Sequence, residues 1–85
     1  MSSLKTTRYF DEQVRRKRPY IEGASIEAVL AAPIRRVVQP DGRVRLWGAV
    51  ADRRDGKTRV LRVVTLEDGE TVHNAFFDRD FEDGP

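Results

Sequence analysis

Three Asp-Gly pairs between residues 41 and 69 constrain the fold of this 85-residue chain more than any other feature. They are Asp41-Gly42, Asp55-Gly56 and Asp68-Gly69, and each lies between two runs rich in apolar and β-branched residues. An Asp-Gly pair in that setting favours a β-hairpin, because both residues tolerate the positive φ angles of a two-residue type I′ turn. The pattern therefore predicts a meander of four antiparallel strands over residues 34–39, 43–50, 58–66 and 70–77.

The chain before the first predicted strand is typical of two short helices. One is expected over residues 7–18, with Thr7 as its cap and Pro19 as its stop. The second is expected over residues 25–32, with Ser25 as its cap and Pro33 after its end. The predicted fold class is α+β, in which two short N-terminal helices are packed on one face of the four-stranded meander, in the order ααββββ.

Size and composition narrow the class of protein. Eighty-five residues predict a single domain over residues 1–85, ordered over about 7–79 and ending in an acidic tail over 78–85. The chain has no cysteine, which excludes disulfides, thiolate metal sites and a cysteine nucleophile. Because it has neither a signal-peptide pattern nor the roughly 20 apolar residues that cross a bilayer, we expect a cytoplasmic protein that engages no membrane.

The charge is unevenly distributed along the chain. The net charge of +2 combines residues 1–66, where 15 basic and 7 acidic side chains give +8, with residues 67–85, where 1 basic and 7 acidic side chains give −6. A basic body favours an anionic partner such as nucleic acid. The acidic end is expected to screen that body.

The expected hairpin registers sort the strand residues into two faces. Two-residue outer loops pair Arg36 with Trp47 and Val64 with His73, and the middle loop is expected to pair Val50 with Arg59. Since side chains alternate with period two, one face collects the predicted core. That face holds Val37, Leu46, Leu61, Val63, Val72 and Phe76. The other face holds Arg36, Arg45, Trp47, Arg62, Val64 and His73.

The second face carries groups that bind nucleic acid. Guanidinium groups bind phosphate bidentately, and an indole ring stacks on a base. The alternative interpretation is structural: Arg36 and Trp47 form an ordinary cross-strand cation–π pair, and the arginines keep an exposed strand face soluble.

The single histidine, His73, also has two interpretations. It either has a structural role in its strand or transfers a proton near neutral pH, where nearby arginines would lower its pKa. One histidine and no cysteine predict no metal site, and no cofactor motif is present.

A resemblance adds to this picture. The segments RKRPYIEGASIEAVLAAPIRRVVQPDGRVRLWGAV and RVLRVVTLEDGETVHNAFFDR cover most of residues 9–79. They resemble small bacterial proteins related to the BrnT-like toxins of the RelE/ParE superfamily, which belong to type II toxin–antitoxin systems. The features shared are a helix ending in a basic stretch, a short helix running into VLAAP, and an Asp-Gly hairpin followed by Trp-Gly.

The resemblance implies a RelE-like sheet with helices on one side, a cognate antitoxin partner, and metal-independent cleavage of mRNA by attack of a ribose 2′-OH. Carried over by position, it makes His73 and Arg62 the catalytic candidates. The RNA-binding candidates are Arg36, Arg45, Trp47, Arg79 and Lys17. The partner of His73 in proton transfer stays open among Tyr9, Tyr20, Lys17 and Glu70.

The functional expectation is a toxin-like, RNA-interacting protein that acts as a metal-independent endoribonuclease. The alternative is a non-catalytic protein-binding module whose sheet face or edge receives an acidic peptide. A further alternative is sequence-independent binding of nucleic acid without cleavage.

Overall fold

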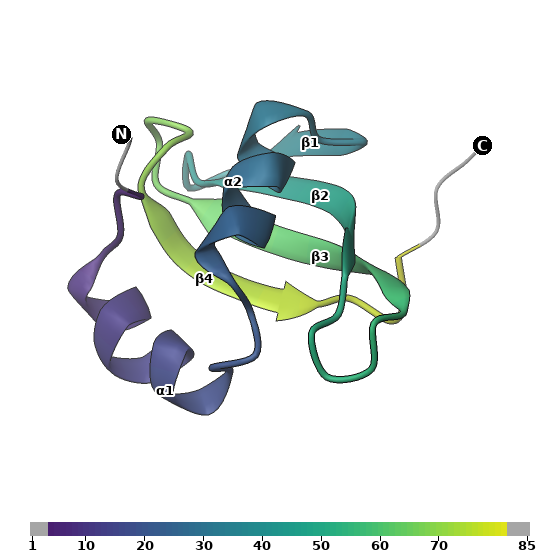
Figure 1. Ribbon diagram of the computed structural model, residues 1–85. Helices are drawn as coiled ribbons and strands as arrows, with labels where there is room; N and C mark the ends of the chain where they lie inside the picture. Colours follow the sequence, from purple (N-terminus) through teal and green to yellow (C-terminus); the bar gives the residue numbers. More distant parts are fainter. Residues whose placement is uncertain (1–3, 82–85) are drawn as a thin grey trace.

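A computed structural model describes residues 4–81; residues 82–85 of the predicted tail lie outside the described residues. Four strands form one antiparallel sheet in the order β1-β2-β3-β4, and with the helices this is an α+β fold (Figure 1). The elements are η1 (Phe10–Val14), α1 (Arg15–Lys17), α2 (Gly23–Ala31), β1 (Arg35–Val38), β2 (Val44–Ala51), β3 (Thr58–Thr65) and β4 (Val72–Phe77). None of the helices within residues 4–81 is long and apolar enough to cross a membrane.

The three Asp-Gly pairs each form the turn of a hairpin, but the turns are not of the predicted type I′. Only the glycines have positive φ in the described chain, at 92°, 75° and 70° for Gly42, Gly56 and Gly69. The aspartates keep negative φ because each carboxylate accepts the backbone N–H two residues ahead. These donors are the amides of Arg43, Lys57 and Glu70, at 3.0, 3.0 and 2.9 Å. Such Asx turns lengthen the loop beyond two residues.

The longer loop shifts the register of the first hairpin by one residue. The amide of Gln39 donates to the carbonyl of Arg43, so that the loop contains three residues. Arg35 therefore lies opposite Trp47, and Arg36 lies opposite Leu46. The predicted pairing of Arg36 with Trp47 is wrong, and Arg36 belongs to the opposite face of the sheet.

In the third hairpin the pairs beyond a bulge are shifted by one residue in the opposite direction, while the middle hairpin is as predicted. Val64 lies opposite Asn74, and a bulge follows between Val64 and Thr65, so the predicted pairing of Val64 with His73 is also wrong. The middle register, with Val50 opposite Arg59, is confirmed. Four predicted core positions, Leu46, Leu61, Val63 and Val72, are buried. Val37 and Phe76 are not in the core because their strands are shifted.

Helix α2 covers one face of the sheet over β2 and β3 (Figure 1). A Cβ atom on Gly48 of β2 would lie 2.9 Å from Cγ2 of Val29, so the glycine permits this close approach. The helix begins at Gly23, and Ser25 lies inside it rather than capping it; no side chain caps α2. The core consists of Phe10, Val14, Ile26, Val29, Val44, Leu46, Leu61, Val63, Val72 and Ala75.

The first helical segment, η1 and α1, lies beside the outer edge of β4 (Figure 1). Thr7 caps it as predicted, since its Oγ1 accepts the amide of Phe10 at 3.1 Å. The chain before it continues along β4: the amide of Thr7 donates to Val72, and the amide of Val72 donates to Lys5. Phe10 and Val14 enter the same core as α2, which leaves the other face of the sheet without a helix.

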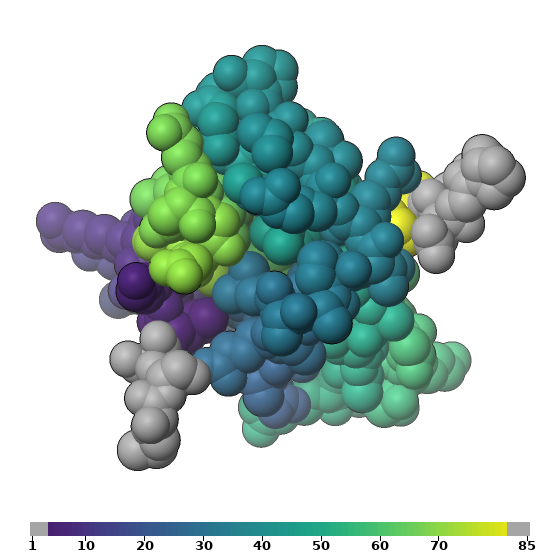
Figure 2. All heavy atoms as spheres, turned by 90° about the horizontal axis from the view of Figure 1, so that it is seen from above, coloured from purple at the N-terminus to yellow at the C-terminus, as the bar shows by residue number. Residues whose placement is uncertain are grey.

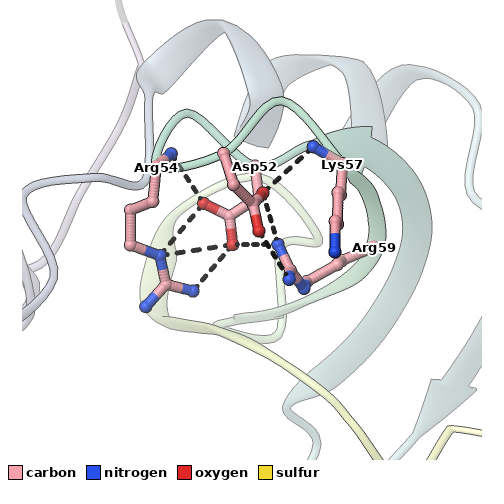
Figure 3. Close-up of polar contacts among 5 residues, drawn as sticks. Asp52, Arg54, Lys57 and Arg59 are labelled. Carbon is pink, nitrogen blue, oxygen red and sulfur yellow. Dashed lines mark hydrogen bonds and ion pairs between the residues drawn. The ribbon is translucent and has the colours of Figure 1, made fainter.

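A polar cluster closes the β2–β3 hairpin (Figure 3). The carboxylate of Asp52 is fully buried and accepts from Nη2 of Arg54 at 2.7 Å and from Nη1 of Arg59 at 3.0 Å. Arg59 also pairs with Asp55, and Arg54 lies 3.8 Å from the ring centre of Tyr20, in the linker after α1. Hydrogen bonds from Arg54 lower the pKa of Asp52 to about 2. Arg54 and Arg59 are thus neutralised within a structural cluster.

Candidate functional site

The helix-free side of the sheet gathers arginines and aromatic rings in register. Arg35, Trp47, Arg62 and Phe76 lie opposite one another in a single row across all four strands. The guanidinium of Arg62 lies between the two rings, 5.6 Å from the centre of Trp47 and 5.1 Å from that of Phe76. Arg18, after α1, continues the row at 5.8 Å from Phe76. With Arg45 in the neighbouring row, these six residues form what we call the arginine face.

Two arginines at the centre of this face have polar atoms without partners. The Nε atoms of Arg45 and Arg62 are buried and form no hydrogen bond within the described residues. Burial and the charge of Arg45 lower the pKa of Arg62, whereas Asp78 raises it. Across residues 4–81, no hydrogen bond or ion pair joins the side chains of Arg18, Arg35, Arg45 or Arg62 to another residue. The face is therefore a concentration of positive charge that forms no ion pair within the described part of the chain, with Asp78 as the carboxylate that acts on it.

Trp47 is the anchor of the chain that follows β4. Its indole is only 8% exposed, and its Nε1 donates to Oδ2 of Asp78 at 3.0 Å. The ring of Phe81 lies 5.7 Å from that of Trp47. The beginning of the predicted acidic tail consequently lies over Trp47, and the indole is not open for stacking on a base in this arrangement.

His73 lies at the bulge of β4, between Val72, which is buried, and Asn74. Its Nδ1 is 3.0 Å from Oγ1 of Thr7, and the ring of Tyr9 stacks on the imidazole with centres 4.8 Å apart. Burial lowers the pKa of His73, and the charge of Arg43 lowers it further. Strand alternation places Arg43 on the same side of β2 as Arg45, so His73 borders the arginine face.

The structure brings together only some of the predicted site residues. Arg45, Trp47 and Arg62 are neighbours, with His73 at their border. Arg36 is on the opposite face, Lys17 is exposed on α1, and Arg79 is exposed after β4. Of the four open partners for His73, Tyr9 contacts the imidazole, whereas Tyr20 stacks on Phe77 and Glu70 pairs with Lys5.

Sequence reasoning missed several members of the site. Arg35 and Phe76 would have been found by a one-residue shift in the outer hairpins, because Arg36 was chosen in place of Arg35 and Phe76 was assigned to the core face. Arg18 and Thr7 carried no such signal, since their helical segment reaches the site only through its contacts with β4.

The arginine face lies on one side of a sheet and does not line either of the two depressions found among the described residues. One depression lies between α2 and the β3–β4 turn, and the other lies beside the β1–β2 turn. No group of three or more His, Asp or Glu side chains within residues 4–81 is arranged to hold a metal ion. A cationic surface on one side of a sheet suits an extended polyanion better than a small molecule.

The chain has no significant match among protein-family models, curated proteins or solved structures. Any functional assignment therefore depends on the residues and geometry of the arginine face and its border.

Proposed function

We propose that the arginine face binds the phosphodiester backbone of RNA, and that the protein is a toxin-like, RNA-interacting protein. The observation that carries this proposal is the pair Arg45 and Arg62, whose buried Nε atoms have no partner in residues 4–81. The contrast with Arg54 and Arg59, which are neutralised by Asp52 and Asp55, strengthens it.

The physical reason is the cost of an unsatisfied polar group. A buried donor without an acceptor destabilises a fold by about 1–3 kcal/mol. Phosphate oxygens supply both acceptors and negative charge, and guanidinium groups bind them bidentately. An RNA backbone would therefore compensate the charges of Arg45 and Arg62 together, and it would satisfy their Nε atoms once the two side chains turn towards it.

The finer proposal follows the sequence resemblance: a RelE-like, metal-independent endoribonuclease with a cognate antitoxin, acting in the cytoplasm. In that chemistry Arg62 would neutralise charge on the phosphoryl oxygens while a ribose 2′-OH attacks the phosphorus. His73 would be the acid–base group, and its place beside Arg43 at the border of the arginine face supports this role.

Alanine variants of two neighbouring arginines, which lie on opposite faces of β1, provide a test of the binding proposal. Arg35→Ala and Arg36→Ala remove the same charge one residue apart, but only Arg35 belongs to the arginine face. With a fluorescent 20-nucleotide single-stranded RNA, anisotropy titrations should show a clear loss of affinity for Arg35→Ala and little for Arg36→Ala. Each lost phosphate contact should lower the slope of log K against log salt by about 0.7. Equal losses in both variants would contradict binding at this face.

Cleavage needs a separate test. The purified chain with EDTA should cut RNA but not an RNA whose riboses lack the 2′-OH. His73→Ala and Arg62→Ala should abolish cutting while their far-UV circular dichroism stays that of the wild type. Binding without cutting would leave a nucleic-acid-binding protein and remove the ribonuclease activity from the proposal.

One observation favours a second candidate function, a protein-binding module. All four residues of edge strand β1 are exposed, and the view from above shows the teal atoms of the β1–β2 hairpin open at the surface (Figure 2). Ile34, Val37 and Val38 are 46, 37 and 56% exposed. An extended peptide could add to this edge, and Arg35 and Arg36 would select an acidic one.

A displayed library of ten-residue peptides tests this candidate. Selected peptides should alternate acidic and apolar residues, and their amide-shift footprint should fall on β1. A footprint on the arginine face instead would show that the peptides merely replace RNA there.

A further inference from the structure

The hydroxyl of Thr7 forms hydrogen bonds to two residues that are far apart in the sequence, Phe10 and His73. Its Oγ1 accepts the amide of Phe10 at 3.1 Å, which caps the first helical segment. The same Oγ1 lies 3.0 Å from Nδ1 of His73, which is 66 residues away in the chain. One side chain thus joins the start of a helix to the bulge of β4.

A count of protons assigns the second bond. A threonine hydroxyl has one proton and two lone pairs. The amide of Phe10 uses one lone pair, and Nδ1 of His73 is the acceptor that residues 4–81 offer to the proton. If Nδ1 carried the proton instead, the hydroxyl proton of Thr7 would have no acceptor among these residues.

We propose that Thr7 is a positioning residue for His73: its hydroxyl donates to Nδ1, holds the neutral imidazole as the Nε2–H tautomer, and leaves that N–H as the free polar atom of the ring. Tyr9 stacks on the imidazole and restricts the orientation of its plane. Arg43 of the β2 end is the charged group that acts on the ring, and it disfavours the imidazolium. Arg43 therefore favours a neutral ring, and Thr7 fixes its tautomer.

This tautomer refines the role of His73, and that part of the inference rests on the proposed function. The lone pair of the neutral ring is on Nδ1, where Thr7 occupies it, so the resting ring is not ready to take a proton from a 2′-OH. It is ready to donate a hydrogen bond from Nε2 to a phosphoryl oxygen. Service as a base would first require the proton to move to Nδ1 and the Thr7 hydroxyl to turn from donor to acceptor.

Nitrogen NMR reads the tautomer directly. Because the chain has one histidine, long-range ¹H–¹⁵N correlation of the uniformly labelled full chain reports His73 alone. Above its pKa, the wild type should show a protonated Nε2 and an unprotonated Nδ1. Thr7→Ser should show the same pattern. A wild-type ring protonated at Nδ1, or an even mixture of the two tautomers, would overturn the inference.

Thr7→Asp separates the positioning role from the capping role. A carboxylate still accepts the amide of Phe10, and aspartate is a good cap. It has no proton to donate, however, and must accept from Nδ1–H instead. This variant should therefore reverse the tautomer of His73 and raise its pKa while circular dichroism stays unchanged. A folded Thr7→Asp variant with the wild-type tautomer would contradict the assignment.

Binding of the 20-nucleotide RNA to Thr7 variants tests whether the tautomer of His73 matters for the proposed function. Thr7→Ser should bind it like the wild type, and Thr7→Val should bind it about 2–10-fold more weakly, the range expected for one lost hydrogen bond. Unchanged binding by a folded Thr7→Val would contradict the ligand role of His73. If no variant binds RNA, the proposed function fails, while the NMR result still decides the tautomer.

Discussion

The indole N–H of Trp47 donates to Oδ2 of Asp78 at 3.0 Å, and this bond fastens the chain after β4 to the arginine face. Phe81 adds an aromatic contact to the same indole. Burial lowers the pKa of Arg62, and the carboxylate of Asp78 opposes that change, so it acts on the arginine that we propose to bind phosphate. The first part of the acidic end would therefore compete with the proposed RNA ligand for this face.

Removing the charge of Asp78 should increase the affinity for RNA. Asp78→Asn keeps an oxygen that can accept from Trp47 but no longer compensates Arg62, so binding at low salt should tighten several-fold. Anisotropy titrations measure the change, and Asp80→Asn serves as the control because Asp80 is exposed. The same gain in both variants would indicate a general charge effect rather than a contact with Arg62.

Trp47, the only tryptophan, should report the position of this segment. Phe81→Ala should expose the indole, shift its emission to longer wavelength and increase its quenching by iodide. A chain ending at Asp78 should behave in the same way and should bind RNA more tightly, because it lacks three acidic side chains (Asp80, Glu82 and Asp83) and one basic one, Arg79, so that its net charge is more positive by 2. Unchanged emission in both variants would show that Phe81 does not shield Trp47 in solution.

Acid should destabilise the fold in a definite range of pH. Hydrogen bonds from Arg54 and from Thr71 lower the pKa values of Asp52 and Asp68, each to about 2, from the ordinary 3.8, and Arg59 lowers the pKa of Asp55. Since the unfolded chain takes up these protons first, the stabilisation is complete above about pH 4 and is lost as the pH falls from 4 to 2. Urea midpoints at pH 7, 4, 3 and 2 should fall mainly over the last two steps.

A variant of the same cluster provides the control for that pH dependence. Asp55→Asn should have a lower midpoint than the wild type at pH 7. The difference should shrink towards pH 2, because Asp55 of the unfolded wild type takes up its proton in this range while the folded carboxylate stays ionised. A difference independent of pH would mean that the pair Asp55–Arg59 contributes little through its charge.

Gly48→Ala should destabilise the contact between α2 and β2. The added methyl would lie 2.9 Å from Cγ2 of Val29, and overpacking of this kind costs about 1–3 kcal/mol. Gly23→Ala, where no atom lies within 4 Å of the new Cβ, should change the free energy of unfolding by less than about 1 kcal/mol.

The double variant Gly48→Ala/Val29→Ala should lose less free energy of unfolding than the sum of the losses of the two single variants, because Val29→Ala removes the atoms that clash with the new methyl group. Chemical unfolding of the four chains measures this coupling. Strict additivity of the two substitutions would show that the loss arises elsewhere than at the Gly48–Val29 contact.

Much of the fold follows from local patterns. The Asp-Gly pairs predict all three hairpins, and the strand boundaries agree with the structure to within two residues at each end. The cap by Thr7 and the burial of Leu61 and Val63 are confirmed, because a cap depends on neighbours in the chain and the middle register was correct. Ser25 did not cap α2, since the helix begins two residues earlier.

The site was predicted less completely for one physical reason. Each outer hairpin is out of the expected register by one residue, the first because of its three-residue loop and the third because of the bulge at His73. A shift of one residue moves a side chain to the other face of a strand. The sequence placed Arg36 on the site face, where the structure has Arg35. It also placed Phe76 in the core, where the structure packs Phe77 instead. Arg45 and Arg62 lie on the predicted side of the sheet because the register of β2 and β3 was correct. His73 also lies on the predicted side, because it is the residue of the bulge.

The sequence by itself determined the hairpins, the strands and the excess of basic residues, because turn chemistry and alternation act over a few neighbouring positions. Only the tertiary structure decided which arginines are neutralised. Arg54 and Arg59 converge on the buried Asp52, whereas Arg45 and Arg62 lie side by side among aromatic rings, without a carboxylate partner in residues 4–81. Net charge counts side chains, but compensation depends on distance and burial, which arise when segments far apart in the chain are brought together.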